Sequence, residues 1–151
     1  MFVPEDFEPP LQMDTGPFRL VPLEPAHNEA DLAAWTSDIG HVRRTPGFPH
    51  RGWPPPQGMA PGRNREDLAR HRDDFRARRG FTYTVLAGPA GEVIGCVYLY
   101  PSAVPPHDAE VRTWVRGADA ALDGPLHDAV TAWLATDWPF RSVRHPGRDA
   151  G

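Results

Sequence analysis

The sequence has no lysine: all 16 of its basic residues are arginine. This excludes chemistry that needs a lysine Schiff base or the lysine of a phosphate-binding P-loop. The single cysteine, Cys96, excludes an internal disulfide and a zinc site built from cysteines. No apolar run approaches the roughly 18 residues that a membrane span needs, and the acidic N-terminus lacks the basic and apolar regions of a signal peptide. We therefore expect a cytoplasmic protein.

The length of 151 residues predicts one domain with an ordinary core. Twenty acidic residues give a net charge of −4, which argues against broad binding of nucleic acid. Seven arginines and four acids lie between Arg63 and Arg79. A solvated helix face explains this cluster, and the alternative is a surface for an acidic acceptor or an RNA backbone.

Two segments are rich in proline. Residues 1–17 hold four prolines and little periodicity, which predicts a loosely ordered arm before a domain over 18–151. Residues 45–63 hold six prolines and four glycines, which exclude a helix or an interior strand. Since Phe48 and Trp53 give this loop apolar content, we favour a packed loop over a solvated linker.

Hydrophobic periodicity and turn residues predict eight elements in the order strand, helix, helix, strand, strand, strand, helix, strand. Asn28 and Asn64 are candidate N-caps of the first two helices, and Gly40 and Gly80 are candidate stops. A hairpin pair followed by a strand–helix–strand crossover predicts a mixed sheet in an α/β (α+β) layer. The expected strands are 18–23, 81–87, 92–100, 109–116 and 142–145, and the expected helices are 28–39, 64–79 and 123–138.

This order resembles the GNAT-type N-acetyltransferase superfamily over roughly residues 18–146. The stretch AEVRTWV (109–115) is similar to the family's fourth strand, and GEVIG (91–95) resembles its third strand. The resemblance implies a GNAT-like α/β fold. It also implies a C-terminally abbreviated member, because the family usually adds a helix and two strands after its fifth strand.

The resemblance implies acetyl-CoA-dependent transfer of an acyl group to an amine, of a small molecule or a peptide. In the family, the cofactor lies where the fourth and fifth strands diverge. The backbone of Trp114, Val115 and Arg116 would hold the pantetheine arm. Gly124 would belong to the pyrophosphate loop at the next helix N-terminus, where backbone N–H groups and the helix dipole favour an anion. Glu110 occupies a strand position where several members keep a catalytic base.

The resemblance also places the acceptor. Tyr98 and Tyr100 share one face of the third expected strand and would line the acceptor pocket, with Tyr100 as a second catalytic candidate. The loop 45–63 lies where the family positions acceptor-contacting segments, so Phe48 and Trp53 would contact the substrate.

Each candidate has an alternative explanation. Packing alone explains Trp114 and the tyrosines, and an exposed strand edge explains Glu110. His107 and Asp108 carry side chains that could bind a metal ion. Alternate residues of a strand point to opposite faces, however, and no second cluster completes a site, so no metal is expected.

The pyrophosphate loop departs from the family pattern Q/R-x-x-G-x-G/A, since only the glycine of Ala121–Leu126 fits it. Pro125 removes a backbone donor, and Asp123 places a negative charge where a diphosphate would sit. Arg116 and Arg141 are candidates to offset that charge. Two alternatives to acyl transfer therefore stay open. The chain could have lost CoA binding and bind a small molecule or a protein, or it could run different chemistry in the same cleft.

The predicted strands lead to one requirement for cofactor binding and one prediction about assembly. The cofactor hypothesis requires the strands that end near Trp114 and Val143 to diverge and leave a slot for a thioester. A last strand at 142–146 would also leave an unprotected sheet edge, which predicts a homodimer.

Overall fold

The computed structural model describes residues 1–148 and contains one sheet of six strands in the order β1 to β6. Neighbouring strands are antiparallel, except that β5 and β6 run parallel. Parallel neighbours need a crossover connection, and a helix supplies it here. The strands are β1 (Met13–Thr15), β2 (Phe18–Pro22), β3 (Phe81–Ala87), β4 (Glu92–Pro101), β5 (Ala109–Val115) and β6 (Val143–Arg144).

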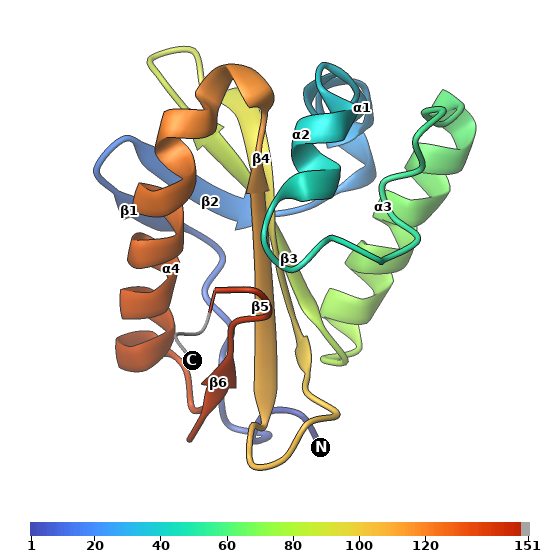
Figure 1. Cartoon of the computed structure of the whole chain (residues 1–151). Coiled ribbons are helices and arrows are strands. Elements are labelled where there is room, and N and C mark those ends of the chain that lie inside the picture. The colour runs from blue at the N-terminus through green and yellow to red at the C-terminus, as the bar shows by residue number, and fades with distance from the viewer. Residues whose placement is uncertain (149–151) are drawn as a thin grey trace.

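Helices cover both faces of the sheet (Figure 1). On one face lie α1 (Asn28–Thr36), α2 (Ile39–Arg44) and α3 (Pro61–Arg76), and on the other lies α4 (Asp123–Asp137). Short 3-10 helices, η1 (Pro25–His27) and η2 (Gly117–Leu122), precede α1 and α4. The predicted mixed α/β architecture is thereby confirmed. Among residues 1–148, no helix is long and apolar enough to cross a membrane.

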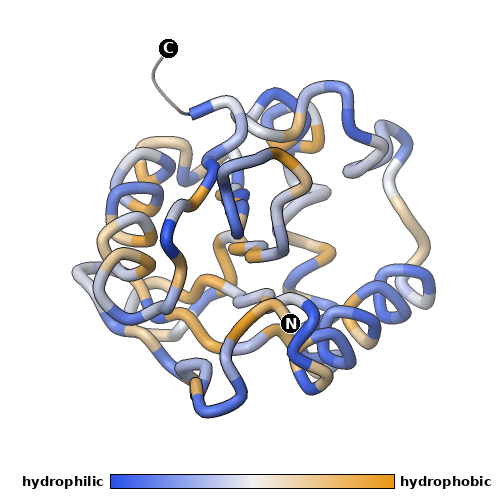
Figure 2. The backbone as a smooth tube through the Cα atoms, turned by 90° about the horizontal axis from the view of Figure 1, so that it is seen from below, coloured by the Kyte–Doolittle hydropathy of each residue, from blue (hydrophilic) through white to orange (hydrophobic). Residues whose placement is uncertain are grey.

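The sheet separates two apolar layers, and the hydrophobic stretches gather at the centre of the molecule (Figure 2). The layer against α4 is the larger one. The layer against α1, α2 and α3 contains the site described below. Its buried members include Trp35, Val42, Phe48, Leu68, Cys96 and Trp114.

A β-bulge in β4 decides which side chains reach this second layer. Val85 of β3 pairs with Gly95, but Leu86 pairs with Val93, so Ile94 is an extra residue. An extra residue shifts the alternation of side chains along a strand. As a result Val93 and Cys96, three positions apart, lie in the same layer.

Several helix boundaries differ from the prediction. Gly40 does not end a helix but lies inside α2, and α3 ends at Arg76 instead of Arg79. Asn64 is not an N-cap. The helix begins at Pro61, whose missing N–H is tolerated in a first turn, and Asn64 is a buried residue inside it.

The N-terminal segment, expected to be loosely ordered, contains β1 and packs against the body of the protein. The Phe2 ring stacks on Phe81 and Phe140. The Tyr83 hydroxyl donates a hydrogen bond to the Pro10 carbonyl at 2.6 Å. The sequence pattern gave little sign of this because the segment has no periodicity.

The edge strand β6 is short. It pairs with β5 through two residues, and Pro146 follows two positions later. Such an edge exposes little backbone to a second chain. The homodimer stays a prediction of the sequence.

Candidate functional site

A cavity of about 420 Å³ lies between α3, the proline-rich loop (residues 45–60) and the strands β4 and β5. Sites for small molecules commonly enclose about 300–1,000 Å³. Of the nine candidate site residues, the cavity brings together Phe48, Trp53, Tyr98, Tyr100 and Glu110. The four expected to hold a cofactor are not among its lining residues.

Trp53 anchors the proline-rich loop over the cavity. Its ring centroid lies 5.4 Å from that of Trp35, 5.9 Å from Phe48 and 6.0 Å from Tyr98. The loop is therefore packed, as its apolar content indicated. It gives the cavity an aromatic wall, whose ring faces carry partial negative charge.

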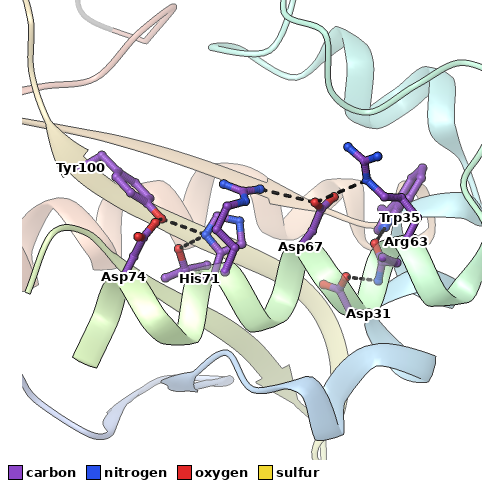
Figure 3. A network of polar contacts seen from close by, with 10 residues as sticks. Asp31, Trp35, Arg63, Asp67, His71, Asp74 and Tyr100 are labelled. Atoms are coloured by element: carbon purple, nitrogen blue, oxygen red, sulfur yellow. Dashed lines mark hydrogen bonds and ion pairs between the residues drawn. The ribbon is translucent and has the colours of Figure 1, made fainter. Parts of the chain in front are cut away.

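Asp31 of α1 lines the cavity and is buried; it belongs to a network of polar contacts along α3, at the opposite end from Tyr100 (Figure 3). The Asn64 amide donates to Asp31 Oδ2 at 3.1 Å, and Asn64 Oδ1 accepts a hydrogen bond from Trp35 Nε1 at 3.1 Å. No residue among 1–148 forms an ion pair with Asp31. Burial foremost, with the charge of Asp67 in addition, raises the pKa of Asp31 to about 6. A buried, ionised carboxylate without a cationic partner destabilises the folded protein, and a bound cation would remove this cost.

Guanidinium groups gather around Glu110. Arg112 Nη1 lies 2.5 Å from Glu110 Oε1, and Arg144 Nη1 lies 3.3 Å from Oε2. Arg112 Nε also donates to the Gly47 carbonyl at 2.9 Å, which ties the proline-rich loop to β5. Both oxygens of the expected catalytic base are therefore engaged by arginine.

His71 of α3 also lines the cavity (Figure 3). Its Nδ1 lies 2.9 Å from the Tyr100 hydroxyl and 3.1 Å from Thr82 Oγ1, and Tyr100 donates its proton to Asp74 at 2.9 Å. Because Tyr100 has only that proton, its oxygen accepts from His71 Nδ1. Burial foremost lowers the pKa of His71 to about 4, so the ring is neutral at pH 7 and Nε2 can accept a hydrogen bond. Tyr100, a catalytic candidate, serves here to orient the histidine.

Sequence reasoning missed Asp31, Asn64 and His71 because their residue types suggested capping or a solvated helix. A signal was present. Asn64, Leu68, His71 and Phe75 recur at helical spacing, which places the amide and the imidazole on the apolar face of α3. Polar residues on an apolar face mark a buried network or a site.

The strands β5 and β6 pair over two residues and then diverge, as the cofactor hypothesis requires. The gap is filled by the chain itself. The Arg148 guanidinium donates two hydrogen bonds to the Asp123 carboxylate, at 2.8 and 2.9 Å, and another to the Thr113 carbonyl of β5 at 3.3 Å. Beside it, Gly147 approaches the proline-rich loop so closely that a Cβ would lie 2.6 Å from the Gly47 nitrogen.

The start of α4 lacks features of the pyrophosphate site that the family resemblance implies. At the start of α4, Pro125 offers no N–H, and Asp123 adds a negative charge to the first turn, which disfavours a bound diphosphate. Arg116, expected to offset that charge, instead pairs with Glu92 at 2.7 Å and Asp119 at 2.6 Å. Arg148 is the residue that neutralises Asp123.

The remaining cofactor candidates have packing environments. Trp114 is completely buried, and its Nε1 donates to the Tyr98 hydroxyl at 2.9 Å, so its side chain supports the floor of the cavity. Val115 is buried in the opposite layer. A Cβ on Gly124 would meet nothing within 4 Å, so no close approach requires glycine there.

No protein-family model matches the sequence, and no curated protein gives a significant match. Solved structures do match. Ribosomal-protein-S5-alanine acetyltransferase from Vibrio fischeri gives a TM-score of 0.63 at 13% identity, over 83% of this chain and 67% of that chain. Ribosomal L7/L12 alpha-N-protein acetyltransferase in complex with coenzyme A gives 0.60 at 12%, over 85% and 68%. An acetyltransferase (GNAT family) from Bacillus anthracis gives 0.55 at 10%, over 82% and 65%. At such low identity these likenesses show a shared fold.

Proposed function

We propose that this chain, whose fold is that of the GNAT-type N-acetyltransferases, binds a small molecule through an amine in the cavity beside α3. The observation that carries the proposal is the Asp31 carboxylate, which is buried at the cavity without a cationic partner among residues 1–148. An ammonium group would supply the missing charge. The faces of Trp53 and Tyr98 favour the same charge through cation–π attraction.

Exchange of Asp31 for asparagine tests this proposal. With 4-methylbenzylamine as the probe, we expect Asp31→Asn to weaken binding about tenfold or more, because a charge-assisted hydrogen bond is worth about 1.5–3 kcal/mol. Since the pKa of Asp31 is about 6, wild-type affinity should fall about tenfold per pH unit below pH 6. Isothermal titration calorimetry measures both effects. Asp137→Asn, at the exposed end of α4, is the matched control.

A folding measurement separates loss of binding from loss of structure. The pKa of Asp31 is higher in the folded chain than in the unfolded one, so the folded state binds the proton more tightly. Stability without ligand therefore declines as pH rises from about 4 to 6. Asp31→Asn lacks this decline and should melt no lower than wild type at pH 7. Equal affinity of wild type and Asp31→Asn for the amine would contradict the proposal.

The second candidate function is acyl transfer to an amine held in the same cavity. The likeness of the fold to acetyltransferases favours it. Both oxygens of Glu110 are bonded to arginines. The neutral His71 ring lines the same cavity and could orient the amine through a hydrogen bond to Nε2. This function would require Arg148 to leave the gap between β5 and β6, because its guanidinium bonds the backbone there.

Acetyl-CoA distinguishes the two candidates. We expect no change in the melting temperature of the wild type at about 1 mM acetyl-CoA, because Arg148 and Asp123 fill the site. Saturating ligand would otherwise add about 2.7 kcal/mol at 100 times its dissociation constant, a rise of roughly 5–10 °C. Arg148→Ala tests whether the guanidinium alone excludes the cofactor, with the exposed Arg141→Ala as the control. A rise in the wild type would make acyl transfer the leading function.

A further inference from the structure

We infer that the ligand of this cavity is a zwitterion, with an amine at one end, an acid group at the other and an apolar spacer between them. This inference rests on the proposed function. It comes from the charges at the cavity wall, which are Asp31, Asp67, Glu110, Arg51, Arg70 and Arg112.

Four of these six charges neutralise one another. Arg70 lies 3.5 Å from Asp67, and Arg112 lies 2.5 Å from Glu110. Asp31 and Arg51 are left over. Neither forms an ion pair with any residue of the described chain, so they do not pair with each other. The wall therefore holds one unmatched negative and one unmatched positive charge.

Arg51, the unmatched arginine, lies near Glu110, where positively charged side chains already outnumber negatively charged ones. Arg112 and Arg144 share the Glu110 carboxylate, so Arg51 is the third guanidinium near one acid. Burial foremost, and then the charge of Arg112, lowers the pKa of Arg51, while Glu110 acts in the opposite direction. A carboxylate or another oxyanion from a ligand would relieve this repulsion, and guanidinium groups bind such oxyanions with directed hydrogen bonds.

The two unmatched charges lie beside different turns of α3. Asp31 accepts a hydrogen bond from Asn64, whereas Tyr100 bonds His71 (Figure 3). Glu110, the acid near Arg51, pairs in register with Tyr100. Asn64 and His71 are seven residues apart, about 10 Å along a helix. The side chains reach inward from both ends, so a ligand with its amine and acid several bonds apart would span them.

The wall between these charges is aromatic. Phe48, Trp53 and Tyr98 all line the cavity, and the three ring centroids lie 5.9 to 6.3 Å from one another. Flat apolar groups pack well against such rings. The spacer of the ligand is accordingly a ring or a short hydrocarbon chain.

Three probes of one size test the inference by calorimetry on the full chain. 4-(Aminomethyl)benzoate carries both charges, 4-methylbenzylamine carries only the amine, and 4-methylbenzoate carries only the acid. We expect the zwitterion to bind the wild type at least tenfold tighter than either analogue. Asp31→Asn should reduce its affinity to that of 4-methylbenzoate, and Arg51→Gln to that of 4-methylbenzylamine. Arg141→Gln, an exposed arginine away from the cavity, should change neither value.

The outcomes separate this inference from the function on which it rests. If 4-methylbenzylamine binds as tightly as the zwitterion and Arg51→Gln has no effect, the zwitterion is wrong while amine binding stands, as for a peptide N-terminus. If none of the three probes binds, both the zwitterion inference and the proposed binding of an amine are wrong. Arg51 lines the cavity but is only partly buried, so we expect Arg51→Gln to fold even where Asp31→Asn proves unstable.

Discussion

Gly95→Ala, which adds a methyl group at the one glycine within the strands of residues 1–148, is expected to destabilise the protein strongly. A Cβ at this position would lie 2.1 Å from the Trp114 carbonyl oxygen and 3.1 Å from its carbonyl carbon. The obstacle is the backbone of β5, which cannot rotate away as a side chain can. The methyl group must therefore push β4 and β5 apart beside the bulge. We expect a loss of about 4 kcal/mol or more, a drop in melting temperature of roughly 8–16 °C.

Gly124→Ala is the matched control for this substitution. A Cβ there would meet nothing within 4 Å, and the position lies in the first turn of α4. Alanine in a helix is favoured over glycine by up to about 1 kcal/mol, so this variant should be as stable as the wild type or slightly more stable. Calorimetric unfolding of the two variants gives the comparison. Similar melting temperatures would show that β4 and β5 can separate at Gly95 without cost.

The second large effect is expected for Trp114→Ala. The indole is fully buried, and its Nε1 donates to Tyr98, which lines the cavity. Truncation of a buried tryptophan commonly costs about 3–5 kcal/mol, here a drop of roughly 6–20 °C in the melting temperature. Urea unfolding at 25 °C measures it as a change in free energy.

Trp114→Phe separates packing from the hydrogen bond. It keeps most of the apolar volume and loses the donor to Tyr98, so we expect a smaller cost of about 1–3 kcal/mol and weaker binding of 4-methylbenzylamine. Unchanged stability of Trp114→Ala would contradict the packing role of this residue.

The fold could be predicted from the sequence because the patterns that indicate its strands, helices and turns are local. Alternating strands, the hairpin turn before Glu92 and the crossover helix after β5 each follow from periodicity and turn residues. The element order then identified the fold, which the comparison with solved structures confirms. The errors lie where tertiary contacts override local preference. Asn64 looks like an N-cap in sequence, but the helix starts earlier and uses its amide to hold Asp31 and Trp35.

Only about half of the site could be predicted from the sequence. Aromatic and acidic residues on neighbouring strands, such as Tyr98 and Glu110, converge because the register of a sheet is regular. The other half comes from α1, α3 and the proline-rich loop, whose approach to the sheet depends on packing that no local pattern encodes. The role of Arg148 shows the same limit. Its partners Thr113 and Asp123 are 35 and 25 positions away, and nothing in the local sequence relates them.

The extra residue at Ile94 has a consequence for how this chain should be compared with distant relatives. On the two sides of Ile94, the alternation of β4 side chains between the two apolar layers is out of phase by one position. An alignment without a gap in this strand will match residues that face α4 in one protein with residues that face the cavity layer in another, on one side of the bulge. A single-residue gap placed at Ile94, inside a strand instead of a loop, restores the correspondence.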